Sequence, residues 1–248
     1  MTTPTSPDES PRTEKGERTR IQILDAALSL FLERGYEGTT MRAIAQRAGA
    51  SLGNAYYYFR SKEHLIQAFY ERTHHEHLAA CGDILDTERD FETRLLGVMR
   101  AKLNTIMPYH RFSGVLFKTA ADPESPLNPF SDLSQPVRRE STGVFAEVVR
   151  GSDLPVPDEI AATLPEMLWL YHMGVVLYWI HDTSPACERS YRLVERSAGL
   201  IAVMVRTASN PLMRPLTRRV LSLLEAVGVE VRDIDAPQPD APRPGDPE

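Results

Sequence analysis

The chain has 248 residues, of which 42% are hydrophobic and 25% charged, a balance that suits one medium or two small globular domains and argues against a disordered chain. It shows no apolar signal peptide, its longest apolar stretch (167–180) is shorter than the about 20 residues of a membrane span, and its two cysteines form no CxxC pair, so we expect a cytoplasmic protein with no membrane partner. The net charge of −6 hides an asymmetry, because residues 12–62 carry nine basic and five acidic side chains, as a DNA-contacting segment would.

Helical periodicity runs through almost the whole chain, and no segment alternates as a strand would. The first three expected helices lie at about 17–34, 40–48 and 52–58. Gly35 supplies a stop for the first helix, and Thr39 or Thr40 can cap the second. Apolar residues recur on one face of each of the first two helices: Ile21, Leu24, Leu28 and Phe31, then Met41, Ile44 and Ala45.

The helices expected further along are longer. A fourth starts after Ser61 and places Leu65, Ile66 and Phe69 on one face. The remaining helices are expected at 89–107, 109–121, 133–150, 158–181, 185–208 and 212–227. The helix at 158–181 is apolar on most of its circumference, which predicts that it is covered on all sides. The helix at 185–208 carries an expected apolar stripe of Leu193, Leu200, Ile201 and Val205.

The most informative segment is 39–66, TTMRAIAQRAGASLGNAYYYFRSKEHLI. Two short helices meet at Gly49, a residue that can adopt the positive φ of a tight turn. Ala45 and Ala48 are small enough to let the helices cross closely, and Ser51 can cap the second helix. The segment therefore predicts a helix-turn-helix, which presents its second helix to the major groove of DNA.

The residues of that second helix suit contact with DNA. Its leading edge, 52–54, is slim, and Asn54 can pair with an adenine edge. The tyrosine hydroxyls of 56–58 can donate to phosphate oxygens while one ring packs inward. Lys62 opens the next helix, where its ammonium and free backbone N–H groups can converge on one phosphate.

At these positions the sequence resembles the tetracycline-repressor (TetR) family of transcription regulators. The resemblance covers about 19–66, roughly a fifth of the chain. The matching residues are Ala26, Phe31, Gly35, Tyr36, Thr40, Gly49, Ser51, Tyr56, Phe59 and Ser61-Lys62-Glu63.

The resemblance implies an all-α fold with a division of labour along the chain. An N-terminal three-helix helix-turn-helix domain is expected over 17–62, and a C-terminal helical ligand-binding and dimerisation domain over 63–230. A disordered arm (1–16) and a disordered Pro-rich tail (231–248) would flank them. The implied function is that of a ligand-responsive regulator, by family default a repressor, that binds a palindromic operator in double-stranded DNA as a homodimer and is released by a small-molecule effector.

By the same resemblance, Tyr56, Lys62 and Thr40 would grip phosphates, while Arg42, 52–54 and 57 would face bases. The residues expected at the DNA are Thr40, Arg42, Ser51, Leu52, Gly53, Asn54, Tyr56, Tyr57 and Lys62. Tyrosine occupies both 57 and 58, so which of the two rings faces DNA stays open. No cofactor and no metal are expected.

Residues that could line an effector cavity are aromatic, His or Met side chains of the second domain, although each is a stronger candidate for the core. They are Met107, Phe112, Phe117, Trp169, His172 and Tyr178.

Alternatives accompany these expectations. The cluster 56–59 could be core aromatics. The basic residues Arg12, Lys15, Arg18 and Arg20 could form an arm in the minor groove or a disordered stretch. His74, His75 and His77 suggest a metal cluster that lacks a further ligand, and Cys81 with Cys187 a redox switch.

Two other classes of function compete with DNA binding. The chain could be a helical enzyme or carrier with a helix-turn-helix relic, its chemistry centred on Glu166, Tyr171 and His172, or a protein-binding adaptor. However, no nucleophile elbow, phosphate loop or paired-carboxylate pattern occurs, so we expect no enzymatic activity.

Overall fold

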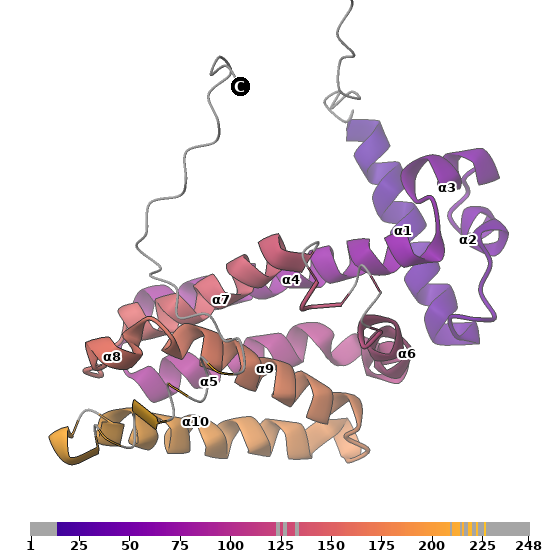
Figure 1. Cartoon of the computed structure of the whole chain (residues 1–248). Helices are drawn as coiled ribbons and strands as arrows, with labels where there is room; N and C mark the ends of the chain where they lie inside the picture. Colours follow the sequence, from indigo (N-terminus) through magenta and orange to yellow (C-terminus); the bar gives the residue numbers. More distant parts are fainter. Residues whose placement is uncertain are drawn as a thin grey trace, which may run out of the picture. The chain divides into compact units, whose positions relative to one another are not determined.

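The computed structural model describes residues 14–122, 125, 128–131, 134–208 and 210–213, with a few further positions up to 226 (Figure 1). The helices are α1 (Glu14–Arg34), α2 (Met41–Arg47), α3 (Leu52–Tyr58), α4 (Lys62–Thr87), α5 (Phe91–Ile106), η1 (Met107–Tyr109), α6 (His110–Ala120), α7 (Gln135–Arg150), α8 (Asp158–Ala161), α9 (Leu164–Ile180), η3 (Pro185–Cys187), α10 (Glu188–Ala208) and η4 (Pro211–Met213). The described residues include no strand, which confirms the all-α class. The predicted tail and most of the predicted helix 212–227 fall outside them, as do residues 1–13 of the predicted arm.

The chain divides into two compact units, one within Met1–His77 and Asn104–Val137 and the other within Leu78–Leu103 and Arg138–Glu248. This division differs from the expected boundary between 62 and 63. The difference arises because α4 is one uninterrupted helix that contributes to both units, and because η1 and α6 pack with the N-terminal helices.

The N-terminal unit is built on the buried face of α1. Leu24, Leu28 and Phe31 are buried as predicted, but Ile21 is 45% exposed, so the expected stripe is wrong at that position. The buried face is instead centred on Ile23 and its helical neighbours, which places Ile21 on the outer side. The predicted inward residues of the next helices are all buried: Met41, Ile44, Ala45, Leu65, Ile66 and Phe69.

Helix α6 completes this core. The ring of Phe112 stacks on Phe31, with centroids 5.2 Å apart, and lies 6.3 Å from the ring of Phe69. Tyr109 of η1 meets Phe69 edge-on at 4.6 Å. The aromatic side chains of η1 and α6 therefore stabilise the helices that carry the helix-turn-helix.

The C-terminal unit is fastened by one buried arginine, Arg94, which is only 1% exposed. Its guanidinium donates to the carbonyl oxygens of Leu85 and Glu88, near the end of α4, at 2.7 and 2.6 Å. It also donates to those of Glu147 and Val148, near the end of α7, at 2.6 and 3.1 Å. The arginine thus satisfies carbonyls that two helix ends leave without a partner within their own helices.

The predicted helix 158–181 is interrupted. α8 ends at Ala161, and α9 begins at Leu164 with Pro165 in its first turn. Proline lacks a backbone N–H and can open a helix but not continue one, so the break falls here. The described helices include none that is both long enough and apolar enough to cross a membrane.

Helix α10 buries a different face from the one expected. Leu193 and Leu200 are 37% and 60% exposed, so the predicted stripe is wrong at these positions. The inward face consists of small and branched residues at helical spacing: Ser190, Val194, Ala198, Ala202 and Val205. Small side chains allow α10 to lie close against α9, beside which it runs (Figure 1). The larger leucines are left outside.

Candidate DNA-binding surface

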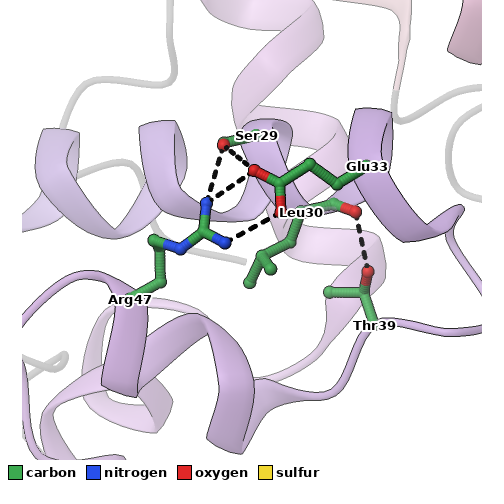
Figure 2. Close-up of polar contacts among 5 residues, drawn as sticks. All are labelled: Ser29, Leu30, Glu33, Thr39 and Arg47. Atoms are coloured by element: carbon green, nitrogen blue, oxygen red, sulfur yellow. Dashed lines mark hydrogen bonds and ion pairs between the residues drawn. The ribbon is translucent and has the colours of Figure 1, made fainter.

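Helix α2 is held against α1 by a set of polar contacts (Figure 2). The guanidinium of Arg47 donates from both terminal nitrogens to the carboxylate of Glu33, at 2.8 Å each, and to the hydroxyl of Ser29 at 3.0 Å. The hydrogen bond from Arg47, joined by one from Ser29, lowers the pKa of Glu33 to about 2. On the preceding loop, Thr39 donates its hydroxyl to the carbonyl oxygen of Leu30 at 3.2 Å. Sequence analysis missed this pairing because residues 33 and 47 have no local relationship along the chain.

The turn between α2 and α3 has the predicted chemistry. Gly49 has φ +66°. Thr40 and not Thr39 caps α2, since its hydroxyl accepts from the N–H of Ala43 at 3.2 Å. Ser51 caps α3 by accepting from the N–H of Asn54 at 3.1 Å. Each cap satisfies an N–H that the helix itself cannot pair, and the first turn of α3 is thereby ordered.

Helix α3 presents one face outward. Gly53 and Asn54 are exposed, and Tyr57 is the most exposed large side chain of the helix at 79%. Tyr56 is 47% exposed, whereas Ala55, beneath the helix, is fully buried. Leu52 and Tyr58 are partly buried against the core, and Thr40, Arg42 and Ser51 are exposed. The two neighbouring rings differ in burial, because Tyr58 packs partly against the core and Tyr57 projects from the protein.

Lys62 is more constrained than its position in the sequence indicates. Its ammonium donates to the carbonyl oxygen of Tyr36 at 2.8 Å and lies 4.1 Å from the centre of the Tyr36 ring. The Tyr36 hydroxyl in turn donates to Glu63 at 2.6 Å, and burial followed by this hydrogen bond raises the pKa of Tyr36. These contacts orient the lysine at the N-terminus of α4. The hydrogen bond to Tyr36 uses one of the three N–H donors of the ammonium.

Three residues of the expected N-terminal arm belong to α1. Lys15, Arg18 and Arg20 are helical, so the disordered interpretation is wrong for them, while Arg12 lies outside the described residues. Arg18 is paired with Glu14 one turn away, and the Arg20 guanidinium lies 5.4 Å from the centre of the Phe59 ring. An exposed i, i+4 pair of this kind adds about 0.2–0.5 kcal/mol to helix stability.

The six candidate effector residues have different environments. Phe112 packs in the core of the N-terminal unit, against Phe31 and Phe69. Met107 of η1 is partly buried and Phe117 is 36% exposed. On α9, Trp169 and His172 are buried, whereas Tyr178 is 43% exposed.

Tyr178 lines a shallow surface groove of about 460 Å³ between α9 and α10. The other lining residues are Arg189, Arg192, Leu193, Arg196, Ser197 and Leu200.

Within the described part of the chain, the histidines and cysteines do not form a metal-binding cluster. His74 and His77 are buried and His75 is exposed, and no three potential metal ligands come together among these residues. Both cysteines are buried, and burial raises the pKa of Cys81 to about 11 and also raises that of Cys187. The thiols are therefore protonated near neutral pH, a form that reacts slowly.

The comparisons with known proteins cover both units. Residues 23–69 match the family described as "Bacterial regulatory proteins, tetR family", and residues 94–222 match "Tetracyclin repressor-like, C-terminal domain". The chain is 35% identical over 190 residues to the transcriptional repressor KstR of Mycolicibacterium smegmatis, an alignment that covers 70% of this chain and 82% of that protein. It is 38% identical over 92 residues to the regulator TtgR of Pseudomonas putida, covering 36% of this chain and 41% of TtgR. The alignments thus span about two fifths of the length of the first curated relatives.

Solved structures share the fold. FadR of Bacillus subtilis, crystallised in complex with stearoyl-CoA, superposes with a TM-score of 0.55 at 15% identity, over 71% of this chain and 95% of that one. A transcriptional regulator from Rhodococcus sp. superposes with a TM-score of 0.57 at 20% identity, over 75% of this chain and 97% of that one.

Proposed function

Because this chain belongs to the tetracycline-repressor (TetR) family, we propose that it is a ligand-responsive, DNA-binding transcriptional regulator that acts as a repressor. The observation that carries the proposal is the outward face of α3, where Asn54 and Tyr57 project beyond a capped and ordered first turn. The relatives named above are regulators, which favours this function over a helical enzyme or an adaptor. No enzymatic activity is proposed.

In the proposed complex, α3 enters the major groove. Asn54 can form two hydrogen bonds with an adenine edge, and the slim 52–54 edge permits close approach. Tyr57 is placed to contact a base or the backbone beside it, and Arg42 lies exposed on α2. Thr40, Tyr56 and Lys62 supply phosphate contacts, which set position and affinity but not sequence preference. Ser51 serves chiefly as the cap.

A homodimer is proposed to form through the outer faces of α9 and α10, which run side by side (Figure 1). These faces expose large apolar side chains, and a contiguous exposed apolar patch is typical of a protein–protein interface. They are Leu177, Tyr178, Leu193, Leu200, Val203 and Met204. A symmetric dimer can set two recognition helices about 34 Å apart, the spacing of successive major grooves on one face of B-DNA. A palindromic operator follows from that symmetry.

The C-terminal unit is proposed to bind a small-molecule effector that releases the operator. A coupling of about 1–3 kcal/mol between the two sites is sufficient for such a response. Most of residues 94–222, the range that matches the C-terminal domain of the family, belongs to this unit.

The test is operator binding by purified protein, with operators selected from fragments of genomic DNA and affinity measured by fluorescence anisotropy. Asn54→Ala should lose about 1–3 kcal/mol of discrimination between operator and mismatched DNA. Lys62→Ala should weaken binding to all sequences and reduce the salt slope by about 1. The matched control is Gln67→Ala, which removes an exposed amide from α4 and should change neither quantity. Parent-like binding by both Asn54→Ala and Lys62→Ala would contradict the proposed interface.

A further inference from the structure

Tyr36 lies in the turn between α1 and α2, and protein covers most of its surface. The residue is 8% exposed, and its ring packs against that of Phe31 on the buried face of α1, with centroids 5.4 Å apart. Its hydroxyl donates to the carboxylate of Glu63 on α4 at 2.6 Å. The ring is therefore fixed from two sides, by the core of the N-terminal unit and by a hydrogen bond to the first turn of α4.

The backbone carbonyl oxygen of Tyr36 joins the starts of two helices. It accepts from the N–H of Thr39 at 3.2 Å and from the ammonium of Lys62 at 2.8 Å, which suits an oxygen with two lone pairs. Thr39 immediately precedes Thr40, the cap of α2, and Lys62 is the first residue of α4. One oxygen thus links the two helix starts at which Thr40 and Lys62 are proposed to contact phosphates.

The Tyr36 ring holds the same ammonium from below. Lys62 Nζ lies 4.1 Å from the centre of the ring, within the range of a cation–π interaction. A lysine side chain that is free in solvent loses rotamer freedom when it binds a phosphate, and this loss weakens binding. Because the ring and the carbonyl already hold the ammonium, less freedom remains to be lost.

We propose that Tyr36 is a positioning residue for DNA binding, which does not touch the DNA and acts by holding the Lys62 ammonium in place for a backbone phosphate. Phosphate contacts carry no sequence information, so Tyr36 contributes to the affinity for every DNA sequence and not to discrimination between sequences. This inference rests on the DNA-binding function proposed above and adds to it a buried residue outside α3.

The experiment compares Tyr36→Leu in two backgrounds, the parent and Lys62→Ala, with DNA affinity measured by fluorescence anisotropy. Leucine keeps an apolar side chain in the core and removes the ring beneath the ammonium. In the parent background, Tyr36→Leu should weaken binding to operator and mismatched DNA alike by about fivefold. In the Lys62→Ala background it should change affinity by less than about twofold, because the group on which it acts is gone. A merely structural role gives the same loss in both backgrounds, and that result would overturn the proposal.

Two further variants separate the ring from the stability of the fold. Tyr36→Phe keeps the ring and the backbone carbonyl, the two groups that touch the ammonium, so it should bind DNA within about twofold of the parent. A loss as large as that of Tyr36→Leu would assign the effect to the hydroxyl and overturn the role of the ring. The matched control is Tyr70→Leu, the same change at a partly buried tyrosine two turns further along α4. Its effect on DNA affinity should be equal with Lys62 and without it.

A measurement on the parent covers the case in which Tyr36→Leu does not fold. The chain has four lysines, and labelling them with ¹³C gives each its own ε-methylene NMR signal, with that of Lys62 identified by its loss in Lys62→Ala. Protons above the face of an aromatic ring are shielded by its ring current, so the Lys62 signal should lie upfield of that of Lys15, an exposed lysine of α1. Equal shifts for these two lysines would mean that the ring does not hold Lys62, and would overturn the proposal.

Failure of this inference and failure of the proposed function give different results. If the parent binds no operator, the proposed function fails, whatever the lysine spectrum shows. If the operator binds and Asn54→Ala loses discrimination, but Tyr36→Leu has the same effect with and without Lys62, only the role of Tyr36 fails.

Discussion

Replacing Gly49 by alanine tests the backbone geometry on which the candidate surface depends. Gly49 has φ +66°, and a Cβ at this position would meet no atom within 4 Å. No steric clash contributes, so the cost is that of the left-handed conformation, about 1–2 kcal/mol for a residue with a Cβ. Alanine also lowers the entropy of the unfolded chain, which returns about 0.4–1 kcal/mol. A net loss of about 1 kcal/mol, or about 2–4 °C in Tm for a chain of this size, is expected.

The assay is thermal unfolding followed by far-UV circular dichroism. Both tryptophans, Trp169 and Trp179, belong to the C-terminal unit, so their fluorescence would miss the N-terminal helices. Gly143→Ala is the matched control, because this exposed glycine of α7 has equally open surroundings without a positive φ and should gain about 0.5–1 kcal/mol. Gly49→Asn should fall between Gly49→Ala and the parent, since Asn tolerates the left-handed region. A Gly49→Ala variant as stable as Gly143→Ala would refute the turn geometry.

Three further predictions concern caps and clamps. Ser51→Ala should cost about 1 kcal/mol through loss of the α3 cap and weaken operator binding, whereas Ser51→Thr should restore both in anisotropy and melting experiments. Arg94→Met should lower the free energy of unfolding by about 3 kcal/mol in urea titrations, because buried carbonyls lose their donors, and Arg94→Lys should recover little of it, since an ammonium cannot reproduce the planar fork. Burial raises the pKa of Asp182, but hydrogen bonds from the hydroxyls and N–H groups of Ser184 and Ser190 outweigh that effect and lower it overall. The ionised carboxylate therefore stabilises the folded protein above the ordinary carboxyl pKa of about 4, and this stabilisation is lost as the pH falls below that value. Asp182→Asn should be less stable than the parent at pH 7, and its stability should depend less on pH on the acid side of the profile.

On α10, hydrophobic periodicity predicts the helix but not which face of it is buried. Leu193 and Leu200 have the hydrophobicity of core residues, and a stripe through them was the natural prediction. The chain instead buries Ala198 and Ala202, because close packing on α9 favours small side chains over large ones. A residue that is apolar but exposed in the monomer suits a second subunit, and periodicity cannot distinguish that use from the core.

The amino-acid sequence alone determined the features that depend on neighbouring residues. The left-handed turn at Gly49, the caps by Thr40 and Ser51, and the helical class follow from backbone chemistry that acts over a few positions, and the structure has them where they were expected.

Only the tertiary structure decided which partners distant residues take. Packing against distant segments buries Tyr58 in part and leaves Tyr57 exposed. It also places Phe112 in the core of the N-terminal unit and brings Lys62 within hydrogen-bond distance of Tyr36. Such contacts are selected by the packing of whole helices, whose faces and crossings depend on every side chain between them and leave no signature in a local stretch of sequence.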